Sequence, residues 1–155
     1  MDEIHGRASL QVDATPQAVF ELITDVDRLP AWNAAIETVL ERPPALAEGA
    51  EWTVKMHPPR TPSWTSISRL EELDRRRFRF AYETRNGDGN PSYTRWAWEV
   101  TGAGGGAEVT VTWDVYLKTA DRRFFGGPLR KRQLAREVPS SLAAMAEAVM
   151  AAEPR

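Results

Sequence analysis

The sequence predicts an α+β domain: a curved, seven-stranded antiparallel sheet wrapped around one long C-terminal helix, with two short helices after the first strand. Seven segments favour strands, most of them by alternating apolar and polar residues, which is typical of a sheet with one buried face. Turn residues separate the last six, so consecutive strands are expected to pair as a meander. The final segment changes to helical spacing.

Length and composition fit a single domain over residues 1–155, because 42% of the residues are apolar and provide a sizeable core. The net charge of −2 gives no general attraction to nucleic acid or to anionic membranes. The chain has no cysteine, which excludes disulfides, thiolate catalysis and zinc–thiolate sites.

No targeting or membrane-spanning segment is expected. The N-terminal stretch "MDEIHGRASL" is acidic and lacks the long apolar centre of a secretory signal. No stretch approaches the apolar length that a membrane span needs. The default expectation is a soluble cytoplasmic domain without a cofactor.

The first elements follow from local signals. "SLQVDA" (9–14) alternates as a strand does, and Thr15 and Pro16 suit the N-cap and first position of a helix. Pro30 ends that helix or opens a short second turn. An apolar helical face is formed by Val19, Leu22, Ile23 and Val26.

The middle of the chain is a series of strands bounded by turn residues. The alternation is cleanest in the last strand, where valines and Trp113 face one way. The six expected strands are "AIETVLERPP" (35–44), "EWTVKMH" (51–57), "SWTSISRLEEL" (63–73), "RFRFAYET" (77–84), "YTRWAWEV" (93–100) and "AEVTVTWDVYLKT" (107–119).

The C-terminal third is expected to form an amphipathic helix from about Gly127 to Ala152. Pro139 lies inside it and predicts a kink, because proline removes a backbone hydrogen bond. The apolar stripe, at spacings of three and four, consists of Leu134, Val138, Leu142, Met145 and Val149.

This order of elements, with "ATPQAVFELITDVDRLPAWNAAI" (14–36) near the start and a long helix after residues 107–119, resembles the START-like superfamily, in particular its polyketide cyclase/dehydrase and lipid-transport branch. The resemblance implies a helix-grip fold with a deep cavity between the sheet and the long helix. Members bind lipids, sterols, hormones or polyketides, and some catalyse cyclisation or dehydration. Trp32 and Asn33 would then lie near the mouth of the cavity.

Shared alternation and the resemblance together predict a mainly apolar, ligand-binding cavity. For any single aromatic residue, filling of the core is the alternative. The predicted lining consists of Phe80, Tyr82, Trp96, Trp98, Trp113, Leu134, Val138, Leu142 and Met145, with Trp32 and Asn33 at the mouth.

Catalytic candidates are few. Aromatase/cyclases of the family resembled have an inward arginine on the strand that matches Arg69, where a fixed cation polarises a carbonyl or an enolate. Solvation, or pairing with Glu71 or Glu83, is the alternative for this side chain. Tyr82 and Asn33 are candidates to assist Arg69 by hydrogen bonding to the substrate. His57 is a candidate for proton transfer or simply a loop histidine, and the two histidines of the chain predict no metal site.

Residues 122–136 contain six cations and no acid: Arg122, Arg123, Arg130, Lys131, Arg132 and Arg136. Cations at a helix start oppose the macrodipole, and an acidic carrier protein is a possible partner that would relieve this. A nucleic acid, an anionic ligand or a crystal contact would do the same, and a solvated helix start is the remaining alternative. Within this segment, "FFGGP" (124–128) is a possible gate.

The leading hypothesis for the whole chain is a protein that binds an apolar, aromatic or polycyclic small molecule. The alternatives are a polyketide cyclase/dehydratase that acts by substrate placement and polarisation, and a protein-interaction domain of the same fold.

Overall fold

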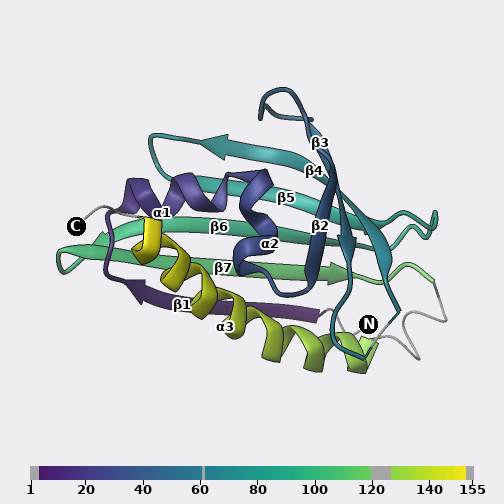
Figure 1. Cartoon of the computed structure of the whole chain (residues 1–155). Coiled ribbons are helices and arrows are strands. Elements are labelled where there is room, and N and C mark those ends of the chain that lie inside the picture. The colour runs from purple at the N-terminus through teal and green to yellow at the C-terminus, as the bar shows by residue number, and fades with distance from the viewer. Residues whose placement is uncertain (1–3, 61, 120–126, 153–155) are drawn as a thin grey trace.

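The computed structural model describes residues 4–60, 62–119 and 127–152. Figure 1 shows a sheet that curves around one long helix, with the short helices on the same side of the sheet. In chain order the elements are β1 (Ile4–Val12), α1 (Pro16–Ile23), the 3₁₀ turn η1 (Val26–Arg28), α2 (Leu29–Trp32), β2 (Ile36–Glu41), β3 (Glu51–Met56), β4 (Trp64–Asp74), β5 (Arg79–Asn86), β6 (Tyr93–Ala103), β7 (Gly106–Tyr116) and α3 (Gly127–Ala152). The predicted fold class is confirmed.

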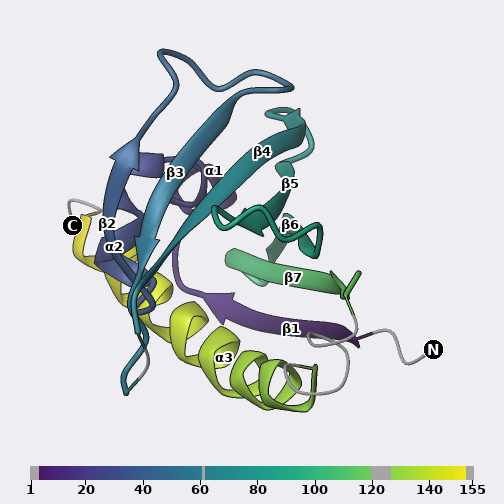
Figure 2. The same ribbon diagram turned by 90° about the vertical axis from the view of Figure 1, so that its right-hand side faces the viewer.

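The sheet is a seven-stranded antiparallel meander in the order β1-β7-β6-β5-β4-β3-β2. The first strand pairs with the last, so β1 lies beside the strand that precedes α3. Register shifts occur between Leu70 and Glu72 in β4 and at two places in β2. Such bulges bend strands and increase their twist, and Figure 2 shows the strongly curved sheet that results.

Helix α1 begins as the sequence predicts. The Thr15 hydroxyl accepts a hydrogen bond from the Ala18 backbone N–H at 3.1 Å, and Pro16 occupies the first turn. The helix buries four residues against the core: Val19, Phe20, Leu22 and Ile23. It packs against β6, β7 and α3. The short helix α2 follows it and buries Trp32.

Helix α3 has 26 residues and is unbroken across Pro139. Proline cannot donate to the carbonyl four residues earlier, which belongs to Ala135. Both Ala135 and Pro139 are exposed, so water can solvate that carbonyl and the helix continues. The predicted apolar stripe is buried: Leu134, Val138, Leu142, Met145 and Val149.

In β7, every second residue from Ala107 to Val115 is buried, as its alternation predicts. Trp113 has an unusual neighbour, because Gly6 lies opposite it in β1. A Cβ at Gly6 would lie 1.9 Å from Cε2 of Trp113, so the indole occupies the space that another residue's side chain would fill. The absence of a side chain at Gly6 therefore allows Trp113 to cover β1.

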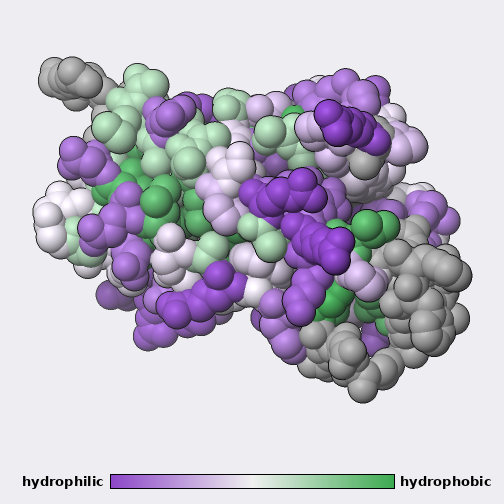
Figure 3. Space-filling model, turned by 90° about the horizontal axis from the view of Figure 1, so that it is seen from below, coloured by the Kyte–Doolittle hydropathy of each residue, from purple (hydrophilic) through white to green (hydrophobic). Residues whose placement is uncertain are grey.

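Figure 3 shows hydrophilic residues over much of the face seen from below, with apolar side chains exposed between them. Within the described part of the chain, no helix combines the length and the apolar character that crossing a membrane requires.

Candidate binding pocket

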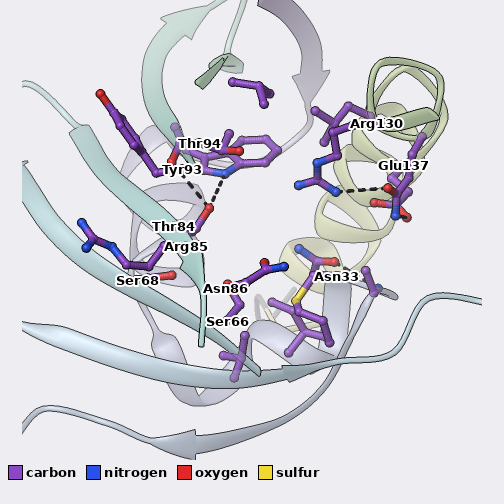
Figure 4. A pocket seen from close by; sticks show the side chains of 18 of the residues that line it. Asn33, Ser66, Ser68, Thr84, Arg85, Asn86, Tyr93, Thr94, Arg130 and Glu137 are labelled. Atoms are coloured by element: carbon purple, nitrogen blue, oxygen red, sulfur yellow. Dashed lines mark hydrogen bonds between the residues drawn. The ribbon is translucent and has the colours of Figure 1, made fainter. Parts of the chain in front are cut away.

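A pocket of about 380 Å³ lies between the sheet and α3. Residues from α2, from β2 to β7 and from the first half of α3 line it. Its volume is in the range that small-molecule sites occupy. Figure 4 shows Asn33 from the α2 end, Asn86 from β5 and Arg130 from α3 directed into this space.

Aromatic side chains form much of the wall. Five of the six tryptophans line the pocket, namely Trp32, Trp52, Trp64, Trp96 and Trp98. The Trp96 indole N–H donates to the Thr84 hydroxyl at 3.3 Å, and the Trp98 indole N–H donates to the Tyr82 hydroxyl at 3.2 Å. These bonds fix two indoles that neighbour each other on β6, leaving their faces for apolar contact.

Trp32 differs from them in one respect. It is 3% exposed and packs edge-on against Trp98, with ring centroids 5.6 Å apart. Among the described residues, its Nε1 is the one buried side-chain nitrogen or oxygen atom without a hydrogen-bond partner. An unpaired buried donor is costly and rare in folded proteins. The Trp32 N–H is therefore an unpaired donor enclosed by protein atoms.

The helix contributes a polar wall. Arg130 donates to the Gln133 side-chain carbonyl at 3.2 Å, and the Gln133 amide donates to the Glu137 carboxylate at 2.9 Å. The two bonds fix the orientation of the Gln133 amide, because its oxygen faces a donor and its nitrogen faces an acceptor. Burial lowers the pKa of Arg130, and the Glu137 carboxylate partly offsets this. Arginine nevertheless stays charged near neutral pH.

Small polar residues of the strands complete the lining: Ser66, Ser68, Thr84, Asn86 and Thr94. Ser66, Ser68 and Thr94 are buried, so their hydroxyls face the interior and not the solvent. The Asn33 side-chain oxygen accepts a hydrogen bond from the Ala35 backbone N–H at 3.1 Å, which leaves its amide N–H₂ group available. The pocket therefore has apolar faces bordered by donors and acceptors.

The predicted ligand-binding residues fall into two groups. Trp32, Asn33, Tyr82, Trp96, Trp98, Leu134 and Val138 line the pocket. Phe80, Trp113, Leu142 and Met145 are buried outside its lining. Phe80 stacks on Trp52 with ring centroids 6.0 Å apart. Leu142 and Met145 lie further along α3, a helix that also contacts α1.

Arg69 does not reach the pocket. It is exposed in β4, between the buried Ser68 and Leu70, and its register partners are Glu51 and Glu83. Side chains alternate along a strand, so the inward positions belong to Ser66, Ser68 and Leu70. The expectation that Arg69 polarises a substrate inside the cavity requires the opposite face, and we assign it no role there.

His57 also lies outside the pocket lining. Its Nδ1 is 3.3 Å from the Glu37 carboxylate, and both side chains are about half exposed. Tyr82, by contrast, is half-buried in the pocket wall, and burial raises its pKa to about 12 despite the opposing hydrogen bond from Trp98. At neutral pH it is a neutral hydroxyl that donates or accepts a hydrogen bond. Among the described residues, no group of three His, Asp or Glu side chains is placed to hold a metal ion.

The structure describes only part of the basic segment, residues 127–136 of 122–136. Arg122, Arg123 and the "FFG" residues 124–126 of the expected gate lie outside the described residues. Lys131, Arg132 and Arg136 are exposed, whereas Arg130 points into the pocket (Figure 4).

The sequence reasoning missed Arg130, Gln133 and Glu137 as pocket residues. One signal was available for Arg130. It precedes Leu134 by four residues, so it extends the helical apolar stripe by one turn toward the N-terminus. An arginine at that position shares the inward face.

The fold is a helix-grip fold with a pocket between the sheet and the long helix. The chain matches the family described as "Polyketide cyclase / dehydrase and lipid transport" over residues 3–150, and it belongs to that family. Comparison with curated proteins gave no match.

Solved structures show the same fold. The chain aligns with CV1439 from Chromobacterium violaceum at 18% identity and a TM-score of 0.77, covering 98% of this chain and 99% of that chain. TTHA0849 from Thermus thermophilus aligns at 22% identity and a TM-score of 0.73, covering 97% and 99%. Zhui aromatase/cyclase from a Streptomyces species aligns at 20% identity and a TM-score of 0.74, covering 96% and 94%.

Proposed function

We propose that this protein binds a flat, apolar small molecule, aromatic or polycyclic, in the pocket between the sheet and α3. The observation in its favour is the concentration of five of the six tryptophans around one pocket. Indole faces favour stacked and edge-on contacts with flat rings.

A neutral fluorescent probe, N-phenyl-1-naphthylamine, tests the proposal. We expect saturable binding with a fluorescence increase, and loss of that binding in Ser68→Phe, because Ser68 is buried and lines the pocket. The matched control is Arg69→Phe, which places the same side chain on the opposite face of β4. Retention of probe affinity in Ser68→Phe, at wild-type stability, would contradict the proposal.

The family description favours one second candidate, which is cyclisation or dehydration of a polyketide-like substrate. In this role the pocket would act by placement and by polarisation of a carbonyl. Tyr82 is the candidate donor, because its pKa of about 12 keeps the hydroxyl protonated. Mass spectrometry of a linear poly-β-ketone incubated with the protein would reveal loss of water. Tyr82→Phe should lower that rate about 100-fold if the hydroxyl stabilises an enolate, and equal rates in the variant would exclude this role.

An acidic carrier protein as the source of such a substrate is a separate proposal. The exposed cations of the first half of α3, Lys131, Arg132 and Arg136, support it by charge complementarity. If they dock a carrier, reversing the charges of Arg132 and Arg136 should weaken the complex, and raising the salt concentration should do the same.

A further inference from the structure

Arg130 is a half-buried cation that faces the pocket without a counter-charge in contact among the described residues. Within that part of the chain, the arginines that form ion pairs are Arg42, Arg79, Arg85 and Arg95, all of them exposed. Arg130 forms no such pair with a described residue, and its hydrogen bond goes to the neutral Gln133 amide. Arg130 is thus a partly buried arginine that faces the pocket and has no described carboxylate in contact.

This arrangement is unfavourable unless something else satisfies the cation. Removing a charge from water is costly without a partner, and burial accordingly lowers the pKa of Arg130, an effect that the Glu137 carboxylate offsets only in part. A guanidinium has five N–H donors, and one hydrogen bond to Gln133 leaves donors free. Arg130 also lies in the first turn of α3, where the helix dipole already disfavours a positive charge. An anion in the pocket would relieve both effects.

The position of Glu137 defines which end of the pocket suits an anion. Glu137 follows Arg130 by seven residues, so the two positions are separated by about 10 Å along the helix axis. The helix wall is therefore positive toward its N-terminal end and negative further along, with Gln133 between them. An anionic group would be attracted at the Arg130 end and repelled at the Glu137 end.

We propose that the molecule bound here is an amphiphilic aromatic anion, whose carboxylate or sulfonate group is held by Arg130 and whose ring system lies against the pocket tryptophans. This rests on the proposed binding function and specifies its ligand class. Arginine suits the role because its planar fork matches an oxyanion with two parallel hydrogen bonds. The five tryptophans provide apolar contact for the rings.

Two dyes that share a ring system distinguish the binding of an anionic group by Arg130, here called the Arg130 anchor, from apolar binding by the rest of the pocket. 1-Anilinonaphthalene-8-sulfonate has the anilinonaphthalene body of N-phenyl-1-naphthylamine plus a permanent negative charge. We expect Arg130→Gln to lower the affinity for the sulfonated dye about tenfold or more, because the variant loses a charged, hydrogen-bonded contact. Affinity for the neutral dye should stay within about twofold, because its contacts are apolar.

The matched control is Arg132→Gln, which removes the same charge from an exposed position on the same helix. It should change neither affinity by more than about twofold, since solvent screens exposed charges. Arg130→Lys is a second variant that keeps the charge and loses the fork, and it should retain part of the preference for the sulfonated dye. Circular dichroism confirms folding of each variant.

The outcomes are distinguishable. If Arg130→Gln and Arg132→Gln lose the same affinity for the sulfonated dye, or if neither loses any, the Arg130 anchor is refuted. Binding of the neutral dye would in that case still support the proposed function. Absence of binding of both dyes to the wild-type protein would refute the anchor and the proposed function together. Selective loss of the sulfonated dye in Arg130→Gln alone supports the assignment.

Discussion

Replacing Trp32 by phenylalanine tests whether its indole N–H lacks a partner, and Trp98→Phe is the matched comparison. Trp32 is 3% exposed and Trp98 is 5% exposed, so the two substitutions remove the same atoms from similarly buried sites. The Trp98 N–H donates to the Tyr82 hydroxyl at 3.2 Å, whereas the Trp32 N–H has no acceptor among the described residues.

The two changes should therefore differ in their effect on the free energy of unfolding. Both lose similar packing. Trp98→Phe also loses a hydrogen bond, which contributes about 1 kcal/mol net, whereas Trp32→Phe removes an unpaired buried donor that costs about 1–3 kcal/mol. The expected difference is about 2–4 kcal/mol, with Trp98→Phe the less stable protein.

Urea denaturation followed by far-ultraviolet circular dichroism measures this difference, with the slope of each transition as the check on two-state behaviour. If Trp32→Phe were destabilised as much as Trp98→Phe, the Trp32 N–H would have a partner in the free protein, such as a buried water. That result would contradict the assignment of Trp32 Nε1 as an unpaired buried donor.

Two further predictions concern the sheet. Gly6→Ala should destabilise the protein by about 3 kcal/mol through overpacking against Trp113, and its melting temperature should fall. Gly102→Ala is the control and should change the melting temperature little, because a Cβ there would lie 3.9 Å from the nearest atom, Cγ of Pro16. Equal melting temperatures would refute the close approach. Because burial raises the pKa of Tyr82 from 10.0 to about 12, its contribution to stability is present below pH 10 and is lost as pH rises through about 12. An ultraviolet difference titration of wild type against Tyr82→Phe checks this, and ionisation at the ordinary pKa would contradict it.

The elements were predictable from the sequence because their periods are clear. β7 alternates without a break, and α3 repeats its apolar residues at helical spacing. Which face of β4 points inward was not predictable, because the inner face includes Ser66 and Ser68. Where small polar residues line a pocket, polarity no longer marks the solvent side of a strand, and the sequence left the direction of Arg69 open for that reason.

The site was only partly predictable, since lining a pocket depends on tertiary neighbours. Trp113 shares the inward alternation of β7, but the bare backbone of Gly6 opposite lets its indole cover β1. Arg130 was grouped with solvent-exposed cations because its charge outweighed its helical position. Only the assembled fold shows that the first turn of α3 faces the pocket.

The central claim, that the pocket binds a flat apolar molecule, is tested most directly by the indole N–H signals in a nitrogen-15 correlation spectrum titrated with N-phenyl-1-naphthylamine. The tryptophans are built-in reporters, because five line the pocket and Trp113 does not. The account predicts that the Trp32, Trp96 and Trp98 signals shift and saturate together, with Trp113 affected least. Unchanged signals for these three, or shifts confined to amides on the outer face of the sheet, would contradict it.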